Sequence, residues 1–168
     1  MSNFVHLHNH THYSILDAVT SPQELVDAAV NDGHPAVALT DHGVMYGVYE
    51  FYKLAVAKNI KPILGVEAYM ANGSRFDRVQ TNKAEKKKNY FHILLHAKDE
   101  QGYKNLMKLT SLGFTEGFYY KPRIDKELLE KYKEGIICSS ACMGGVINAF
   151  IVDGQIEKAY SEAKYYQE

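Results

Sequence analysis

Short apolar segments alternate along the chain with segments whose apolar residues recur every three or four positions. The first kind predicts β-strands and the second predicts α-helices. The predicted strands are residues 4–8, 36–40, 62–66, 90–97 and 135–139. The predicted helices run from about 22 to 33, 45 to 58, 99 to 114 and 125 to 132, and two more follow residue 142. Near-continuous apolar strands separated by helices are typical of a parallel sheet covered on its faces, so the pattern predicts an α/β fold.

Three helix starts carry specific signals. Ser21 is a common N-cap residue, and it is followed by a proline at the first helical position and by Glu24, which completes a capping box. Asp99 and Asp125 precede two other predicted helices, and we expect each to cap the helix that follows it.

Residues 72–89 interrupt the pattern. They begin with Asn72-Gly73-Ser74-Arg75, contain four lysines between positions 83 and 88, and show no periodicity. We interpret this segment as a basic inserted loop that is mobile and whose charges are solvated.

The length of the chain limits its architecture. A chain of 168 residues accommodates about one domain with one sizeable core. Five strand–helix units fall short of a closed eight-unit barrel, which typically needs about 250 residues. Either the sheet is open, or the chain is the N-terminal piece of a longer protein. Residues 165–168 carry no helix-stop signal, which favours the second interpretation.

Composition and charge exclude several classes of protein. With 46% hydrophobic and 23% charged residues, the chain is neither disordered nor collagen-like, and no stretch is apolar enough to span a membrane. A net charge of -1 gives no general basic surface for binding nucleic acid unaided. The two cysteines cannot form a disulfide scaffold or a four-cysteine zinc site. We therefore expect a reducing, cytoplasmic setting without a membrane partner.

Histidine is the residue type that stands out. Four of the eight histidines occupy alternate positions, from His6 to His12. In a strand, His8 and His10 point to the same side with their Cα atoms roughly 7 Å apart, so they can bind one metal ion or bridge two. The chain is expected to leave the sheet near Thr11, which makes His6 and His12 weaker candidates. The alternative is an exposed strand edge with scattered histidines.

Other candidate ligands lie near the ends of the predicted strands: Asp17 shortly after the first, His42 and Glu67 just beyond the next two, His92 on strand 90–97 and Cys142 just past the fifth. The carboxyl ends of parallel strands hold the functional site in α/β folds, so we expect these side chains to lie close together. We expect His96 to be a packed or surface histidine and Cys138 to be a core residue instead. The full set of candidate metal ligands is His8, His10, Asp17, His42, Glu67, His92 and Cys142.

The number and type of these candidates indicate a chemistry. One structural zinc ion needs only four ligands, so seven candidates favour a site with two or three metal ions. Imidazole, carboxylate and thiolate ligands suit zinc, manganese or iron. Two ions about 3.5–4 Å apart generate hydroxide at neutral pH and bind both oxygens of a reacting phosphoester. Hydrolysis of a phosphate ester is the reaction that this set predicts.

Three sequence motifs carry a family resemblance. They are Leu7-His8-Asn9-His10 with Ser14 and Asp17, Leu39-Thr40-Asp41-His42-Gly43, and Lys61-Pro62-Ile63-Leu64-Gly65-Val66-Glu67. Together they closely resemble the polymerase and histidinol phosphatase (PHP) domain. The chain is most similar to the branch of this family found at the N-terminus of bacterial replicative DNA polymerases. That narrower match includes Gly102-Tyr103-Lys104-Asn105-Leu106 and Ser140-Ala141-Cys142-Met143-Gly144-Gly145.

The resemblance implies a fold and a ligand set. The fold is a distorted (β/α)7 barrel of the TIM-like type, with up to three metal ions at the carboxyl ends of its strands. The seven candidates match the family's ligand positions in order. The family's final Asp-x-His motif has no counterpart here, because His96 is the last histidine of the chain. The resemblance thus implies that residues 1–168 are the N-terminal part of a PHP domain.

The resemblance also implies activities and partners. DNA synthesis would belong to magnesium-binding palm, fingers and thumb domains beyond residue 168. The PHP portion would contribute a 3′–5′ exonuclease for proofreading, a pyrophosphatase or a docking platform. The partners implied are DNA, a separate proofreading exonuclease subunit and a sliding clamp. Two alternatives are a free-standing PHP phosphatase acting on small phosphomonoesters and a non-catalytic, metal-stabilised docking module.

Overall fold

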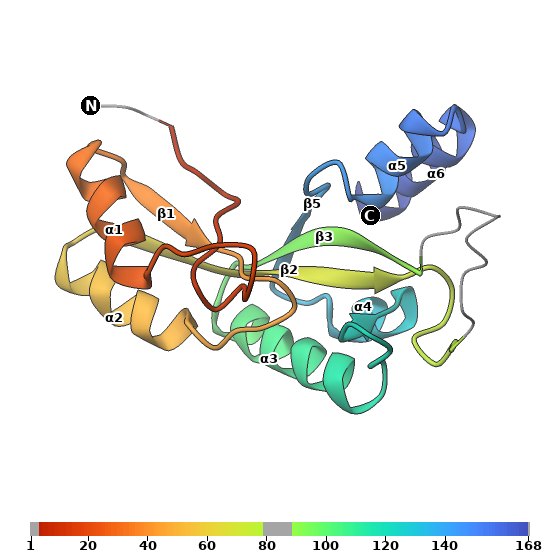
Figure 1. Cartoon of the computed structure of the whole chain (residues 1–168), viewed down its shortest axis with the longest axis horizontal. Helices are drawn as coiled ribbons and strands as arrows, with labels where there is room; N and C mark the ends of the chain where they lie inside the picture. The colour runs from red at the N-terminus through yellow and green to blue at the C-terminus, as the bar shows by residue number, and fades with distance from the viewer. Residues whose placement is uncertain (1–3, 79–88, 168) are drawn as a thin grey trace.

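The computed structural model describes residues 4–78 and 89–167, and its helices and strands alternate as the sequence predicts (Figure 1). In chain order the elements are α1 (Pro22–Asn31), β1 (Ala36–Leu39), α2 (Val48–Ala57), β2 (Lys61–Ala71), β3 (Tyr90–Ala97), α3 (Glu100–Thr115), β4 (Arg123–Ile124), α4 (Lys126–Tyr132), β5 (Ile136–Ser139), α5 (Val146–Val152) and α6 (Ile156–Gln167). The fold is therefore α/β. Within the described residues, no helix has the length and apolarity needed to cross a membrane.

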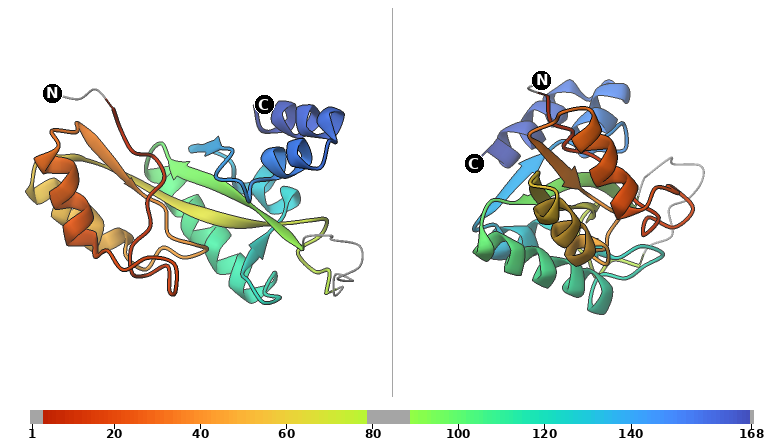
Figure 2. Two further views of the ribbon diagram at one scale, coloured as in Figure 1. Left: turned by 45° about the horizontal axis from the view of Figure 1, so that its top comes forward. Right: turned by 90° about the vertical axis from the view of Figure 1, so that its left-hand side faces the viewer.

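The sheet is mixed, and β2 is its central strand. The first half of β2 pairs with β1 in parallel, and its second half pairs with β3 in antiparallel orientation. Strand β4 pairs with the end of β2, and β5 pairs antiparallel with β3. The left panel of Figure 2 shows β2 and β3 running side by side through the molecule.

Two features of this sheet differ from the sequence prediction. The expected parallel arrangement is wrong for β2–β3 and β3–β5, because β3 starts beside the end of β2, where Tyr90 pairs with Ala71. The chain returns next to β2 instead of crossing over to a parallel position. Among the described residues the strand order runs from β1 to β5 without closing, so a barrel is not confirmed.

The predicted helix caps are present. Ser21 and Glu24 form the expected capping box at the start of α1. The Asp99 carboxylate accepts a hydrogen bond from the Gly102 amide, and the Asp125 carboxylate accepts one from the Leu128 amide. These bonds satisfy amide groups that have no partner within the first turn of a helix.

Two large apolar clusters hold helices α1 to α4 to the sheet, and a third, smaller one packs α5 against β3. The larger lies between the β2–β3 pair and helices α3 and α4, and includes Leu95, Leu106 and Leu109. The second joins α1 and α2 to β1 around Leu39 and the fully buried Phe51. Burying one such side chain stabilises the fold by about 1.5–3 kcal/mol. The two clusters fix β2, which passes between them, as a rigid support.

The strand predicted at residues 4–8 is an extended segment without regular strand pairing. It lies beside β1, where the amides of Ala38 and Thr40 donate hydrogen bonds to the carbonyls of His6 and Asn9. The Asn9 side chain donates to the carbonyl of Ala38. Side-chain bonds thus replace part of the strand ladder, which leaves this segment free to turn towards β2.

The loop interpretation of residues 72–89 is only partly tested. Residues 79–88, which contain all four lysines of the predicted basic loop, lie outside the described residues. In the described part, a solvated loop is wrong for Arg75. Its buried guanidinium pairs with Asp125 and Glu116, which ties the end of β2 to α3 and α4.

Candidate metal centre

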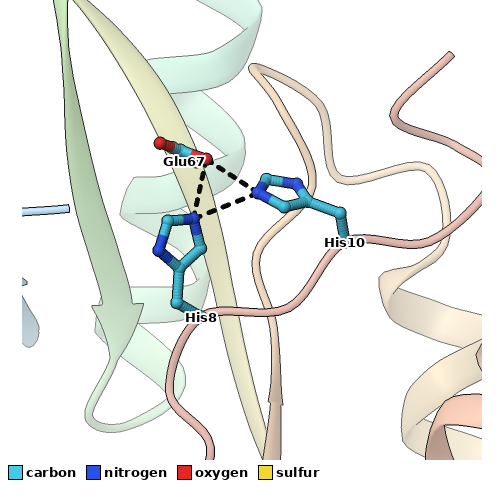
Figure 3. Close-up of side chains that lie close together, drawn as sticks. All are labelled: His8, His10 and Glu67. Carbon is cyan, nitrogen blue, oxygen red and sulfur yellow. Dashed lines mark hydrogen bonds and ion pairs between the residues drawn. The ribbon is translucent and has the colours of Figure 1, made fainter. Parts of the chain in front are cut away.

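The buried side chain of Glu67 is the centre of the candidate site. Glu67 lies in the middle of β2 with 1% of its surface exposed. Its Oε2 atom is 2.8 Å from Nε2 of His8 and 2.8 Å from Nε2 of His10 (Figure 3). The two histidine nitrogens are 3.0 Å apart. The N-terminal segment therefore brings both predicted histidines to one carboxylate oxygen.

The other oxygen of Glu67 faces the residues from β3 and from the loop after β5. Oε1 lies 2.8 Å from Nδ1 of His92 and 3.5 Å from Sγ of Cys142. The expected place at the carboxyl end of a parallel strand is wrong for His92, which is near the start of β3. This end of the strand meets the second half of β2 because the two strands are antiparallel. Strand β5 runs antiparallel to β3, so the loop after β5 returns to the end of β3 where His92 lies and places Cys142 there.

His42 and Asp17 extend the cluster towards solvent. His42 follows β1, and backbone hydrogen bonds on both sides of it, between Asp41 and Glu67 and between Gly43 and Glu67, hold it beside β2. Its Nδ1 is 3.4 Å from Oε2 of Glu67, and its Nε2 is 3.2 Å from Oδ2 of Asp17. Asp17 is the more exposed partner, so this edge of the cluster is open.

Asp41 and Ser14 hold the segment with the candidate ligands in place through hydrogen bonds outside the cluster around Glu67. The buried Asp41 carboxylate accepts hydrogen bonds from the amide and hydroxyl of Thr11 and from the hydroxyl of Ser14. Because Ser14 gives its only proton to Asp41, its oxygen accepts the Nδ1 proton of His10, 3.1 Å away. With a cation bound, neutral His10 would keep this Nδ1 proton and offer the lone pair of Nε2, which lies 2.8 Å from Oε2 of Glu67. Bonds of this kind orient metal ligands in proteins.

Electrostatics favour an ionised Glu67 carboxylate and a neutral His42 imidazole. Burial alone raises the pKa of Glu67, but hydrogen bonds with the surrounding histidines outweigh it and hold that pKa well below its ordinary value. Burial lowers the pKa of His42, and the nearby charges of His10 and His92 lower it further against the opposing effect of Glu67. An anionic carboxylate and imidazole lone pairs are the forms that bind a cation.

These residues fit divalent metal ions. Among the described residues, three groups place one ligand atom from each member within 4.8 Å of the others: His8, His10 and Glu67; His10, Asp17 and His42; and His42, Glu67 and His92. Nδ1 of His42 is buried and has no hydrogen-bond partner in the described part of the chain. Ligand atoms about 2.0–2.1 Å from a tetrahedral zinc ion are roughly 3.3 Å from one another. The distances between the nitrogen and oxygen atoms around Glu67 are close to this value.

The structure brings all seven predicted ligands to one place. His6 and His12 are outside the cluster, and His6 contacts the rings of Phe4 and His34 instead. His96 is buried and bonds to the carbonyl of Leu7, as a packing residue. Cys138 packs beside the larger apolar cluster. The supporting roles of Asp41 and Ser14 were not predicted, although both residues belong to the quoted motifs.

Comparison with protein families gives one match, the PHP domain, over residues 6–168. Three curated relatives are each a "DNA polymerase III subunit alpha". The protein of Borreliella burgdorferi is 47% identical over 99% of this chain, that of Aquifex aeolicus 48% over 99%, and that of Treponema pallidum 45% over 98%. The chain spans only 14% of the length of each of these relatives.

Two solved structures match part of the chain. An amidohydrolase from Chromobacterium violaceum has a TM-score of 0.44 and 23% identity, over 66% of this chain and 34% of that one. A protein from Bifidobacterium adolescentis, described as a metal-dependent phosphoesterase, has a TM-score of 0.42 and 21% identity, over 66% and 33%. Likenesses at this level carry no argument about function.

Proposed function

The chain belongs to the PHP domain family, and we propose that it is the N-terminal part of the PHP domain of a replicative DNA polymerase catalytic subunit. In this proposal, magnesium-dependent DNA synthesis is carried out by palm, fingers and thumb domains that follow residue 168. Further strands beyond that residue complete a distorted (β/α)7 barrel. The intact protein acts in the cytoplasm with DNA, a proofreading exonuclease subunit and a sliding clamp.

For the chain itself, the proposed function is metal-dependent hydrolysis of phosphoesters, such as 3′–5′ exonuclease action on DNA. The single observation that carries this proposal is the convergence of four histidines and a cysteine on the buried Glu67 carboxylate. We infer that the seven clustered residues hold two or three zinc, manganese or iron ions. When bound, such ions supply a hydroxide at neutral pH and neutralise charge on the reacting phosphate.

The chain's own residues orient the ligands and keep one edge open. Ser14 fixes the proton on Nδ1 of His10, so Nε2 is available to the cation. A proton on Nε2 of His42 faces Asp17 and leaves Nδ1 of His42 free towards Glu67. In the reaction, water adds to phosphorus, the bond from phosphorus to the 3′ oxygen breaks, and that oxygen takes up a proton. The products are a shortened strand and a nucleoside 5′-monophosphate.

Metal analysis and a hydrolysis assay test this proposal. Purified full-length natural protein should contain more than one metal ion per chain, and it should shorten a single-stranded oligonucleotide from its 3′ end. Glu67→Gln removes the carboxylate charge that two of the three ligand groups share and should lower the metal content and the rate together. Primer extension by residues 1–168 alone should give no product. A metal content of zero or one would contradict the multinuclear site, and bound metal without hydrolysis would favour a metal-stabilised docking module.

A further inference from the structure

A cavity of about 550 Å³ opens beside the metal centre. His42 and His92 form part of its wall, so anything bound in it lies next to the metal ligands. Much of the remaining lining is aromatic, with Tyr46, Tyr90 and Phe114 among the rings. A volume of this size is within the range of small-ligand sites in proteins. The metal centre therefore has an adjoining space for a substrate group larger than phosphate.

The rings in this cavity present accessible faces. Tyr46 has 66% of its surface exposed and contacts no other ring in the described part of the chain. Phe114 is 40% exposed, and one face of its ring stacks on Phe118 with centroids 6.1 Å apart. Tyr90 is half-buried, and its ring is parallel to the His92 imidazole with centroids 5.9 Å apart. Exposed aromatic faces next to a catalytic centre offer stacking positions for planar groups.

Lys121 supplies the positive charge of the cavity. It is the one lysine or arginine in the lining, and it has no ion pair among the described residues. Its Nζ lies 5.3 Å from the centre of the Tyr69 ring. The preceding Tyr120 has a φ of 60°, an uncommon conformation for a bulky residue, and the Tyr119 amide donates to the Lys121 carbonyl across this tight turn. Strained turns of this kind cluster at functional sites.

We propose that this cavity is a nucleotide subsite of the metal centre. The bases at a single-stranded DNA end stack on the rings of Tyr46, Tyr90 and Phe114, and Lys121 pairs with a backbone phosphate. This inference rests on the proposed hydrolytic function and adds the substrate class that the site prefers. A small phosphomonoester has no planar group for the three rings, whereas every base has one. Stacking involves the face of a base and makes no hydrogen bond to its edge, so the subsite accepts all four bases.

The first test measures binding without hydrolysis. Full-length natural protein loaded with manganese is titrated with deoxythymidine monophosphate, with deoxyribose 5-phosphate, which lacks the base, and with inorganic phosphate. The nucleotide should bind about tenfold more tightly than the sugar phosphate, because stacking of one base contributes on that order. Tyr90→Leu should remove this difference and Tyr90→Phe should keep it. Equal affinities for the nucleotide and the sugar phosphate would overturn the subsite.

The second test separates the subsite from the hydrolytic function. Each variant is assayed with a single-stranded oligonucleotide and with deoxyribose 5-phosphate, a small ester without an aromatic ring whose hydrolysis releases inorganic phosphate. Tyr46→Leu, Tyr90→Leu and Lys121→Gln should lower the ratio of kcat/KM for the oligonucleotide to that for the small ester about tenfold, mainly through KM. Matched controls outside the cavity are Tyr160→Leu on α6 and Lys104→Gln on α3, which should leave the ratio unchanged.

The outcomes distinguish the two proposals. Hydrolysis of both substrates with a ratio that the cavity variants do not change overturns the nucleotide subsite and leaves the hydrolytic function in place. Absence of hydrolysis by metal-loaded protein, together with base-dependent binding that Tyr90→Leu removes, overturns the function and supports the subsite. Melting temperatures close to that of the natural protein establish that each variant is folded.

Discussion

At the residue scale, Asp41 holds the segment that carries His8 and His10 against β1. We predict that Asp41→Ala destabilises the fold by about 1–3 kcal/mol, because the Thr11 amide and the Ser14 hydroxyl lose their buried acceptor. Metal affinity should fall about 10–100-fold as the ligands lose their orientation. Denaturant unfolding and metal titration measure the two effects.

Asp41→Asn should have a milder effect. The carbonyl oxygen of the new amide side chain can still accept from the Thr11 amide and the Ser14 hydroxyl, and its NH2 group can donate to the Thr11 hydroxyl oxygen. The exposed Asp153 provides a control, and Asp153→Ala should leave metal affinity unchanged. Equal metal affinity in Asp41→Ala and the natural protein would contradict the supporting role of this carboxylate.

His96 links folding stability to pH. Burial lowers its pKa below the ordinary value of 6.5, although its bond to the Leu7 carbonyl opposes that shift. The unfolded chain therefore binds a proton that the folded chain excludes, so this residue makes the fold less stable as pH falls below 6.5. We predict that His96→Gln removes this contribution. We compare the unfolding free energies of the metal-free variant and the metal-free natural protein. Their difference should be constant above pH 7, and the variant should become relatively more stable as the pH falls towards 5.

The candidate ligands could be found from the sequence because each is a metal-binding residue type close to the end of a recognisable apolar run. His8 and His10 share one side of an extended segment whether or not that segment forms a regular strand. Asp41 and the rings of the cavity could not be assigned in this way. A buried aspartate and exposed tyrosines gain their roles only from neighbours that are distant in sequence, such as Thr11 for Asp41.

At the element scale, the Arg75–Asp125 pair fastens the end of β2 to the start of α4. Both side chains are buried, and Asp125 also caps α4. We predict that Arg75→Met destabilises the fold by about 3–5 kcal/mol, because it leaves a buried carboxylate without its cation. The exposed pair of Lys133 and Glu130 is the control, and Lys133→Met should cost less than about 1 kcal/mol. Similar losses of unfolding free energy in Arg75→Met and Lys133→Met would show that burial does not increase the contribution of the Arg75–Asp125 pair.

Helices were predicted better than sheet topology because their signals are local. Ser21, Asp99 and Asp125 mark three helix starts within a few residues of sequence. Strand direction has no such local signal, so the antiparallel placement of β3 was not predicted. The two residues of β4 are too few for a period to be visible. Strand β2 was predicted too short, because Glu67 and Tyr69 are buried polar residues that interrupt its apolar run after residue 66, whereas the strand continues to Ala71.

At the scale of the whole molecule, the metal centre joins segments from both halves of the chain. We predict that removing metal with a chelator lowers the melting temperature of the full-length protein and that adding zinc or manganese restores it. Metal at about 100 times its dissociation constant stabilises the folded state by about 2.7 kcal/mol. Calorimetry with and without metal measures the shift.

The same melts on residues 1–168 and on a longer version extended to about 270 residues test whether the site is complete in this chain. We expect a smaller shift for the shorter chain, because a site with fewer ligands binds metal more weakly. Equal shifts would mean that the seven clustered residues suffice.

The spread of the ligands along the chain also has a consequence for synthesis. His8 and His10 leave the ribosome first, while Glu67 and Cys142 are added later. At about 5–20 residues per second, Glu67 follows His8 by roughly 3–12 s. During that interval the two histidines can meet metal ions before the carboxylate that selects their geometry exists. Correct loading therefore depends on exchange of early-bound ions, and the nascent chain is the stage at which a wrong metal enters most easily.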